Sequence, residues 1–285
     1  MGKLPSKTIG NVPSHTMGNV LSTTIGKVLA FYISAILSGI AIEIGLYAVV
    51  RVVFTVFGAS SILMFLVLLG ILTLLIGEMC AFSQNNIKRM LAYSSIGQIG
   101  LILFALAIAT PYAVTGGLFQ LVSHSLAKAL LFLAVGYMVY RTGSMDISTF
   151  EGMGRRMPFT SLAFTVGAFS LVGLPPFAGF PSKFLIIRAV LAKQEVLFTV
   201  FVGLVLLGTV IEGAYFFRVV QTIYFREGKG NPERKEAPFT ALIPIFVLVT
   251  LIIIIGIFPR FITDILNAAA LELLNRVEYI RSVLG

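Results

Sequence analysis

The chain has 285 residues, of which 58% are hydrophobic and 12% are charged. Soluble domains typically carry about 25% charged residues, so this composition excludes an ordinary soluble protein and indicates a protein that crosses a membrane several times. The net charge of +9 does not point to nucleic acid as a partner, because the basic residues form short clusters between apolar stretches and not one stripe.

Seven membrane spans are predicted, within a transmembrane domain over residues 28–258. About 20 apolar residues suffice to cross the hydrocarbon layer. The predicted spans lie near residues 28–57, 61–83, 90–110, 113–141, 158–192, 197–225 and 239–258. The first, fourth, fifth and sixth are longer than a span needs, so we expect them to tilt, extend beyond the membrane or break.

The loops between these spans differ in positive charge from one side to the other. On one side lie Lys3, Lys7, Lys27, Lys88, Arg89, Arg141, Arg155, Arg156, Arg226, Lys229, Arg234 and Lys235. The opposite loops offer little beyond Lys193 and Arg260. By the positive-inside rule, the N-terminus is predicted in the cytoplasm and the C-terminus on the outer side of the cell membrane.

The two ends of the chain differ from the apolar domain. Residues 1–27 are rich in Gly, Ser and Thr and repeat one pattern as SKTIGNVP, SHTMGNVL and STTIGKVL. They lack a continuous apolar run, so we expect a cytoplasmic extension and not a secretory signal. Residues 259–285 place apolar side chains at helical spacing among charged ones. This pattern predicts an amphipathic helix that lies either at the lipid interface or against a partner.

Ionisable side chains inside the predicted spans carry the functional signal. Each costs about 2.5–3.5 kcal/mol on insertion scales, so it needs a partner, a water-filled cavity or a task. In QLVSHSLAKALLFL, His124 and Lys128 stand four residues apart, on one helical face with Gln120 and Ser123 nearby. Histidine exchanges protons near neutral pH, so this strip is a candidate proton relay. In the alternative, His124 only hydrogen-bonds a neighbouring helix and Lys128 reaches toward the interface.

The fifth predicted span, with the sequence SLVGLPPFAGFPSKFLIIRAVL, cannot form one continuous helix. Pro175, Pro176 and Pro181 remove backbone donors around Gly179. Broken helices at membrane depth commonly form ion sites. Lys183 opens the second half, at the positive end of its helix dipole, and is predicted to lie on an ion path. The alternative is a proline kink with a lysine that reaches toward an interface.

Two further carboxylates are candidates for the same path. Glu43 lies within the first span, and any partner is expected from another helix or another chain, since Arg51 is about 12 Å away along the helix. In the alternative, Glu43 is a neutral carboxyl group that hydrogen-bonds a neighbouring helix. Glu212 is flanked by Gly208 and Gly213, which permit close helix approach.

Three other charged residues, Glu78, Lys88 and Arg188, are expected to support the path. Glu78 lies toward the cytoplasmic end of the second span, and we expect it to form a structural salt bridge with Lys88 or Arg89. Arg188 is hard to deprotonate, so it is predicted to tune the local electrostatics or to form a salt bridge.

Five stretches of the chain match the motifs of a known family in order and spacing. They are SAILSGIAIEIGLYAVVR, NNIKRMLAYSSIGQIGLILF, HSLAKALLFL, GMGRRMP and GLPPFAGFPSKFLII, and they extend over residues 33–226. They resemble the antiporter-like, proton-conducting subunits shared by respiratory complex I, archaeal-type membrane-bound hydrogenases and Mrp-type sodium/proton antiporters. The resemblance implies an all-α membrane fold that corresponds to the C-terminal half of such a subunit. One five-helix repeat, with its broken helix, forms the second to sixth spans.

The resemblance also assigns positions. His124 and Lys128 stand on the family's His-x-x-x-Lys pair, and Lys183 stands at the lysine or glutamate of the broken helix. Glu43 occupies the place of the family's central lysine, so the sign of the charge is inverted there. The motifs of the first repeat, with its glutamate–lysine couple, are not found. The chain is therefore expected to provide one half-channel, with neighbouring subunits providing the other.

The implied function is ion translocation in a complex I-like or hydrogenase-like redox complex. The implied partners are other membrane subunits, among them another antiporter-like subunit, an iron–sulfur oxidoreductase arm, and lipid. No cysteine cluster or phosphate loop occurs in the sequence, so neither a cofactor, a metal nor redox catalysis is expected in this chain. Two alternatives stay open: a non-conducting structural or assembly subunit, and a path for sodium through carboxylates beside the unwound GLPPFAGF backbone.

Overall fold

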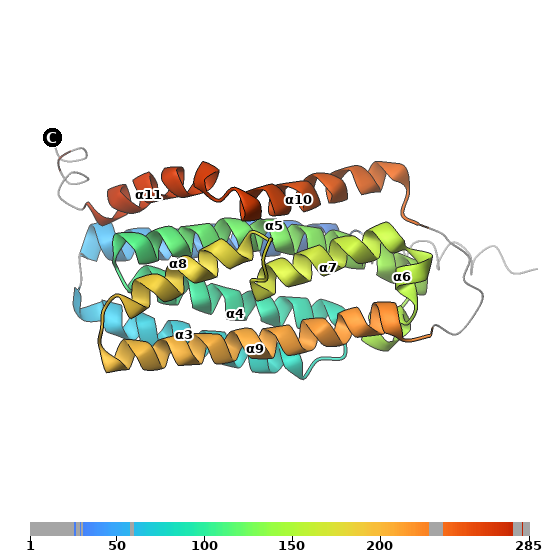
Figure 1. The fold of residues 1–285 in the computed structure, drawn as a ribbon, viewed down its shortest axis with the longest axis horizontal. Coiled ribbons are helices and arrows are strands. Elements are labelled where there is room, and N and C mark those ends of the chain that lie inside the picture. The colour runs from blue at the N-terminus through green and yellow to red at the C-terminus, as the bar shows by residue number, and fades with distance from the viewer. Residues whose placement is uncertain are drawn as a thin grey trace, which may run out of the picture.

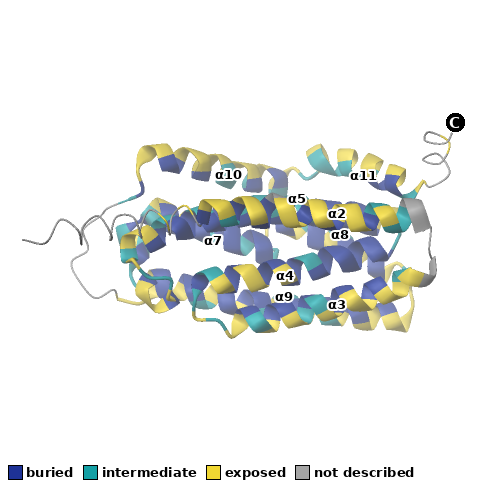
Figure 2. Cartoon of the chain, turned by 180° about the vertical axis from the view of Figure 1, so that it is seen from behind, coloured by how far each residue is buried: buried dark blue, intermediate teal, exposed yellow. Residues whose placement is uncertain are grey.

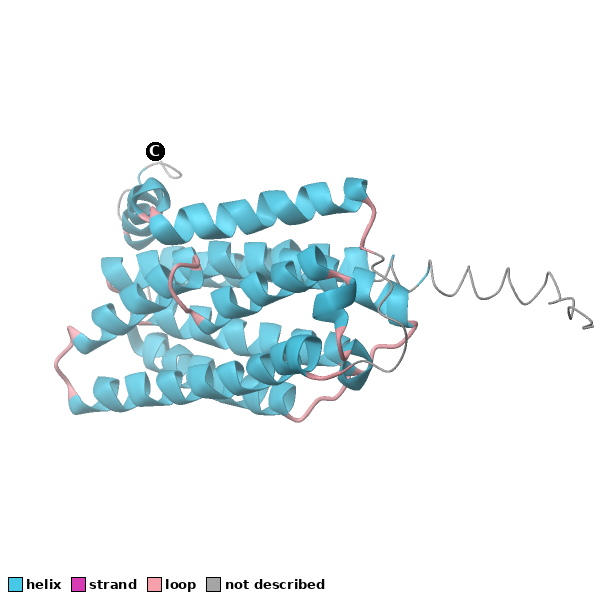
Figure 3. Ribbon diagram, turned by 45° about the vertical axis from the view of Figure 1, so that its right-hand side comes forward, coloured by secondary structure: helices cyan, strands magenta, loops and turns pink. Residues whose placement is uncertain are grey.

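The computed structural model of the protein describes residues 31–57, 60–227 and 236–275, together with residues 26, 29 and 281. All named elements in this part of the chain are helices, and most lie side by side in one bundle (Figures 1 and 3). The expected all-α fold class is therefore confirmed. The repeats of residues 1–27, except residue 26, and Lys229, Arg234 and Lys235 lie outside the described residues.

Six helical segments of the described residues are long and apolar enough to cross a membrane. They are Phe31–Phe54, Ile62–Phe82, Ile87–Ala107, Pro111–Thr142, Val196–Phe225 and Phe239–Ile257. The corresponding helices are α3 (Ser60–Phe82), α4 (Ile87–Ala107), α5 (Pro111–Thr142), α9 (Val196–Phe225) and α10 (Phe239–Ile257), after a composite first span. These agree with the predicted spans to within a few residues. The total of seven spans and the five-helix repeat stay predictions.

The first span changes its helical geometry along its length. Residues 31–36 are α-helical, η1 (Leu37–Ala41) is a π-helical stretch, α2 (Ile42–Arg51) is α-helical, and η2 (Val52–Phe57) is again π-helical. Short π-helical insertions often occur at functional sites because they turn the following side chains around the helix axis. Glu43 follows directly after η1.

The fifth predicted span is two helices, α7 (Pro158–Val172) and α8 (Gly179–Leu191). The loop between them is visible within the bundle in Figure 3. Gly173 ends α7 with φ +85°, a conformation that glycine adopts without strain. Pro175 and Pro176 lie in the break, and Gly179 begins α8. Pro181 is not part of the break, because a proline is tolerated in the first turn of a helix, where its missing N–H has no partner to lose.

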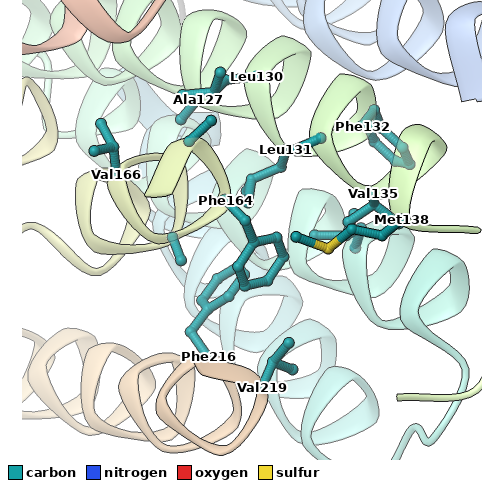
Figure 4. Close-up of a cluster of buried hydrophobic side chains, with 14 of the residues drawn as sticks. Ala127, Leu130, Leu131, Phe132, Val135, Met138, Phe164, Val166, Phe216 and Val219 are labelled. Carbon is teal, nitrogen blue, oxygen red and sulfur yellow. The ribbon is translucent and has the colours of Figure 1, made fainter. Parts of the chain in front are cut away.

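An apolar core holds α5, α7 and α9 together. The rings of Phe164 and Phe216 meet at 61° with 6.4 Å between centroids, and Leu131 and Met138 of α5 pack near them (Figure 4). Large apolar side chains on the outer sides of α3 and α10 are exposed instead (Figure 2). Such outward apolar faces suit contact with lipid or with other membrane helices.

Glycines bring α3 and α4 into close contact. A Cβ atom added at Gly77 would lie 2.8 Å from Cα of Gly97, and one added at Gly100 would lie 2.6 Å from the carbonyl oxygen of Gly70. Small residues at matching positions allow two helix backbones to approach each other inside a membrane. The α3–α4 pair is therefore a tightly packed unit on which polar side chains can be placed accurately.

The predicted amphipathic helix is α11 (Arg260–Leu274), with short η3 (Ile147–Phe150) and α6 (Met153–Arg156) elsewhere. It packs on its own chain, against α5, where Thr115 donates a hydrogen bond to Asn267 at 3.3 Å. Ala270 and Leu273 are buried. The expected neighbours of this helix were the lipid interface or a separate partner. They did not include α5, which contacts the helix in the structure. The predicted continuation through residues 276–280 and 282–285 lies outside the described residues.

We expect Gly100→Ala to lower stability by about 1–3 kcal/mol, because the added methyl group meets backbone atoms of α3 that cannot move independently. The measurement is the thermal unfolding midpoint of the full chain in detergent. Gly45→Ala is the control, since its Cβ meets nothing within 4 Å. Equal midpoints for the two variants would contradict the close packing.

Candidate functional site

The structure buries all five residues predicted for the ion path. Their exposed fractions are 4% for Glu43, 0% for His124, 0% for Lys128, 6% for Lys183 and 1% for Glu212. They come from α2, α5, α8 and α9, so distant parts of the sequence converge inside the bundle. Two direct pairs form, Glu43 with His124 and Lys183 with Glu212, and Lys128 bonds to α4.

The broken helix positions the Lys183–Glu212 ion pair. The Lys183 ammonium lies 2.7 Å from Oε2 of Glu212 and donates a second hydrogen bond to the carbonyl oxygen of Val172 at 3.3 Å. Val172 ends α7, so its carbonyl has no partner in the next helical turn. The break therefore provides the carbonyl acceptor of Val172. It also provides the turn between α7 and α8 that places Lys183 next to α9. Part of the desolvation cost of two buried charges is offset in this way.

A line of amides and a hydroxyl group supports Glu212 from the other side. Gln98 of α4 donates to Oε1 of Glu212 at 2.7 Å, and Gln120 donates to Oε1 of Gln98 at 2.6 Å. Ser182 donates to Oε1 of Gln120 at 2.5 Å. Both carboxylate oxygens of Glu212 therefore accept hydrogen bonds. Gln98 and Ser182 were missed in the sequence, although a glutamine in the apolar stretch SSIGQIGLILF is itself a signal.

Glu43 and His124 form the second pair. Nδ1 of His124 lies 2.6 Å from Oε1 of Glu43, and the Ser125 hydroxyl donates to Oε2 of the same carboxylate. Nε2 of His124 is buried and has no hydrogen-bond partner in the structure. The histidine thus has one ring nitrogen on a carboxylate and the other available to exchange a proton with a further group.

Lys128 faces α4. Its ammonium donates to the carbonyl oxygen of Leu91 at 2.8 Å and to the Ser94 hydroxyl. His124 and Lys128 share a face of α5, as their spacing predicts, but they bond to different neighbours and not to each other. The Ser94 hydroxyl also lies near the Tyr215 hydroxyl of α9, which places Lys128 close to the tyrosine that bonds to Glu78.

Glu78 does not form the expected salt bridge with Lys88 or Arg89. It is fully buried, and its Oε2 accepts a hydrogen bond from the Tyr215 hydroxyl at 2.8 Å. The Lys88 ammonium lies 5.5 Å from the centroid of the Phe31 ring. The reason is the close α3–α4 contact, which places Glu78 against Gly97 and inside the bundle, whereas Lys88 lies beyond the end of α3.

Arg188 also differs from the expectation. It is exposed, and it forms no ion pair with any residue that the structure describes. Five residues turn about 140° around a helix, so Arg188 points away from the side on which Lys183 meets Glu212. It therefore takes no part in the buried site.

Four charged groups form the centre of the site. Glu78 and Glu212 interact electrostatically with each other and with Lys128 and Lys183. The Glu43–His124 pair lies in the same bundle. The site therefore combines carboxyl, imidazole, ammonium and hydroxyl groups from six helices, α2, α3, α4, α5, α8 and α9. These are groups that take up and release protons. Within residues 31–57, 60–227 and 236–275, no three His, Cys, Asp or Glu side chains gather as a metal-binding group.

Comparison with known proteins shows which family has this sequence and architecture. Residues 27–209 match the family model described as NADH:quinone oxidoreductase/Mrp antiporter, TM. The chain belongs to this family. The resemblance seen in the sequence motifs is therefore confirmed, and most of the buried charged groups lie within the matched residues.

The relatives of this family member are about twice its length. F(420)H(2) dehydrogenase subunit N of Methanosarcina mazei is 32% identical over 253 residues, which cover 85% of this chain and 50% of that protein. A chain of the membrane-bound sulfane sulfur reductase, an archaeal respiratory membrane complex, superposes with a TM-score of 0.80 at 35% identity, covering 88% and 51%. A chain of the Mrp complex from a Dietzia species gives 0.81 at 25% identity, covering 88% and 55%. The chain thus spans about half the length of the relatives it matches.

Lys183→Met is expected to destabilise the protein by about 3–5 kcal/mol, because it leaves the Glu212 carboxylate buried without its cation. The double variant Lys183→Met/Glu212→Met removes both charges and is expected to recover most of that loss. Thermal unfolding of the full chain in detergent measures both, with Lys193→Met as a loop control. Additive losses in the double variant would show that the two side chains do not interact.

Proposed function

We propose that the protein is an ion-translocating subunit of a multi-subunit membrane complex and that it provides a half-channel for protons. One observation carries the proposal: two bonded acid–base pairs and a second buried lysine, Lys128, lie in one bundle, and hydroxyl and amide side chains bond to Lys128 and to the Lys183–Glu212 pair. A scaffold gains nothing from buried ionisable groups that cost several kcal/mol each. A proton path requires them, because each group can hold a proton and pass it on.

The proposed path has two parts. Glu43 and His124 form the part nearest the first span, where η1 turns the chain directly before the carboxylate. Lys128, Ser94, Tyr215 and the Glu212–Lys183 pair form the second part, which ends at the broken helix. Water is proposed to bridge the interval between the free Nε2 of His124 and the second part.

The hydrogen bonds that the carboxylates accept favour protons over sodium as the transported ion. Both oxygens of Glu43 accept hydrogen bonds, from His124 and Ser125, and both oxygens of Glu212 accept them from Lys183 and Gln98. A sodium ion needs several oxygen ligands at once. Oxygens that already hold proton donors suit proton exchange better.

The partners and the orientation are proposed from the relatives and from the charged loops. The similar chains belong to an archaeal respiratory membrane complex and to an Mrp complex, so we propose other antiporter-like and small membrane subunits as neighbours. Redox chemistry, with its iron–sulfur clusters, then belongs to a peripheral arm, and lipid covers the remaining apolar faces. Lys88 at the start of α4, Arg141 at the end of α5 and Arg226 directly after α9 lie at one end of the bundle, and we assign this end to the cytoplasm.

Lys183→Ala and His124→Ala are each expected to slow proton flux about tenfold or more, because each removes a group that transfers a proton. The measurement uses the membrane complex purified through a tag on this chain and reconstituted in liposomes. A potassium diffusion potential drives flux, and an enclosed pH-sensitive dye reports it. Lys193→Ala, a lysine in the loop after α8, is the control.

Two outcomes would overturn the proposal. Unchanged proton flux in both variants, with the complex intact on size-exclusion chromatography, identifies a structural subunit. Flux that requires sodium, and that a sodium-sensitive dye detects in place of the pH dye, identifies a sodium path.

A further inference from the structure

A polar pocket lies at the end of the bundle that carries the basic loops, next to η3 and the last turns of α9. It has a volume of about 380 Å³ and is lined by Asn85, Asp146, Ile147, Ser148, Arg218, Thr222 and Arg226. These residues come from the α3–α4 loop, the segment after α5 and the last turns of α9. Neither the Glu43–His124 pair nor the Lys183–Glu212 pair borders the pocket.

One polar face of α9 runs from the buried charges to this pocket. Glu212, Tyr215, Arg218 and Thr222 follow one another at intervals of three or four residues, which places them on the same side of a helix. Ten residues of helix extend over about 15 Å. Glu212 pairs with Lys183, Tyr215 bonds to Glu78, and Thr222 lines the pocket. Arg218 stands between them.

The end of α3 holds Arg218 in this position. Nη2 of Arg218 donates to the carbonyl oxygen of Gln84 at 2.7 Å, and its guanidinium lies 5.8 Å from the centroid of the Phe82 ring. Its Nε is buried and has no hydrogen-bond partner. On the inner side, Oε1 of Glu78 is likewise buried and unpartnered. Buried polar atoms without partners therefore lie on Arg218 and on Glu78, the residue to which Tyr215 bonds.

We propose that this pocket is the mouth of a second arm of the ion path and that Arg218 is its gate. The inference rests on the proposed function and specifies where the path opens at the basic-loop end. A fixed guanidinium in a narrow passage repels cations, including hydrated protons and sodium. With Arg218 in place, the pocket is separated from Tyr215 and Glu78. Movement of Arg218 away from Gln84 connects the pocket to Glu78, Glu212 and Lys183.

The test measures access to the buried charges without measuring transport. The chain has a single cysteine, so Cys80→Ala gives a cysteine-free background. Ser94→Cys then places a thiol beside Lys128 and Tyr215. Membrane vesicles of known orientation, with the chain in its complex, are treated with the cationic, membrane-impermeant reagent trimethylammonium-ethyl methanethiosulfonate. We expect Arg218→Ala to speed labelling from the basic-loop side about tenfold or more, because it removes the repelling charge.

The controls separate charge from general loosening. Arg155→Ala removes an exposed arginine at the same end and is expected to leave the labelling rate of Ser94→Cys unchanged. Arg218→Lys keeps the positive charge and is expected to keep labelling slow. Equal rates with and without the Arg218 side chain, or faster labelling from the opposite side, would overturn the gate.

A second measurement leaves Arg218 intact. Thr222→Cys is expected to react from the basic-loop side, because its side chain lines the pocket, while Ser94→Cys in the same background reacts slowly. An unreactive Thr222→Cys would show that the pocket does not open at that end. Neither labelling result depends on proton flux, so loss of the gate and loss of the proposed function give different outcomes.

Discussion

The requirement that charges inside a membrane be neutralised locally governs this structure. The Lys183–Glu212 pair meets it most completely, because the lysine also takes the free carbonyl of Val172 and the carboxylate also takes Gln98. Without the break between α7 and α8, neither the free carbonyl nor the position of Lys183 would exist. The irregular backbone and the buried ion pair therefore depend on each other, and the polar side chains around them complete the hydrogen bonding.

Uncharged polar residues give the site its continuity. Ser94 contacts both Lys128 and Tyr215, and Tyr215 reaches Glu78, so groups on α5, α4, α9 and α3 are connected by hydroxyls. Hydroxyl groups both donate and accept hydrogen bonds, which allows a proton to move in either direction. A charged lysine ammonium only donates, and it accepts a proton only after it has released one.

Glu43 gives the first span a chemistry unlike that expected from the family. Where the family resemblance implies a lysine, this chain places a carboxylate on Nδ1 of His124. The acid and the base of this pair thus come from α2 and α5, and the second pair takes its acid from α9 and its base from α8. Each of these two carboxylates thus lies beside a basic group, which offsets part of the cost of burying it.

The sequence by itself determined the class of protein, the approximate spans, the break at Pro175 and Pro176 and the identity of five buried ionisable residues, because hydropathy and proline chemistry act locally. Only the tertiary structure decided which side chains of different helices contact each other. Glu78 turned inward to Tyr215 and not to Lys88, because glycines bring α3 against α4, and Arg188 pointed away from the site. Partners across a bundle are set by helix packing and rotation, which no single helix encodes in its own sequence.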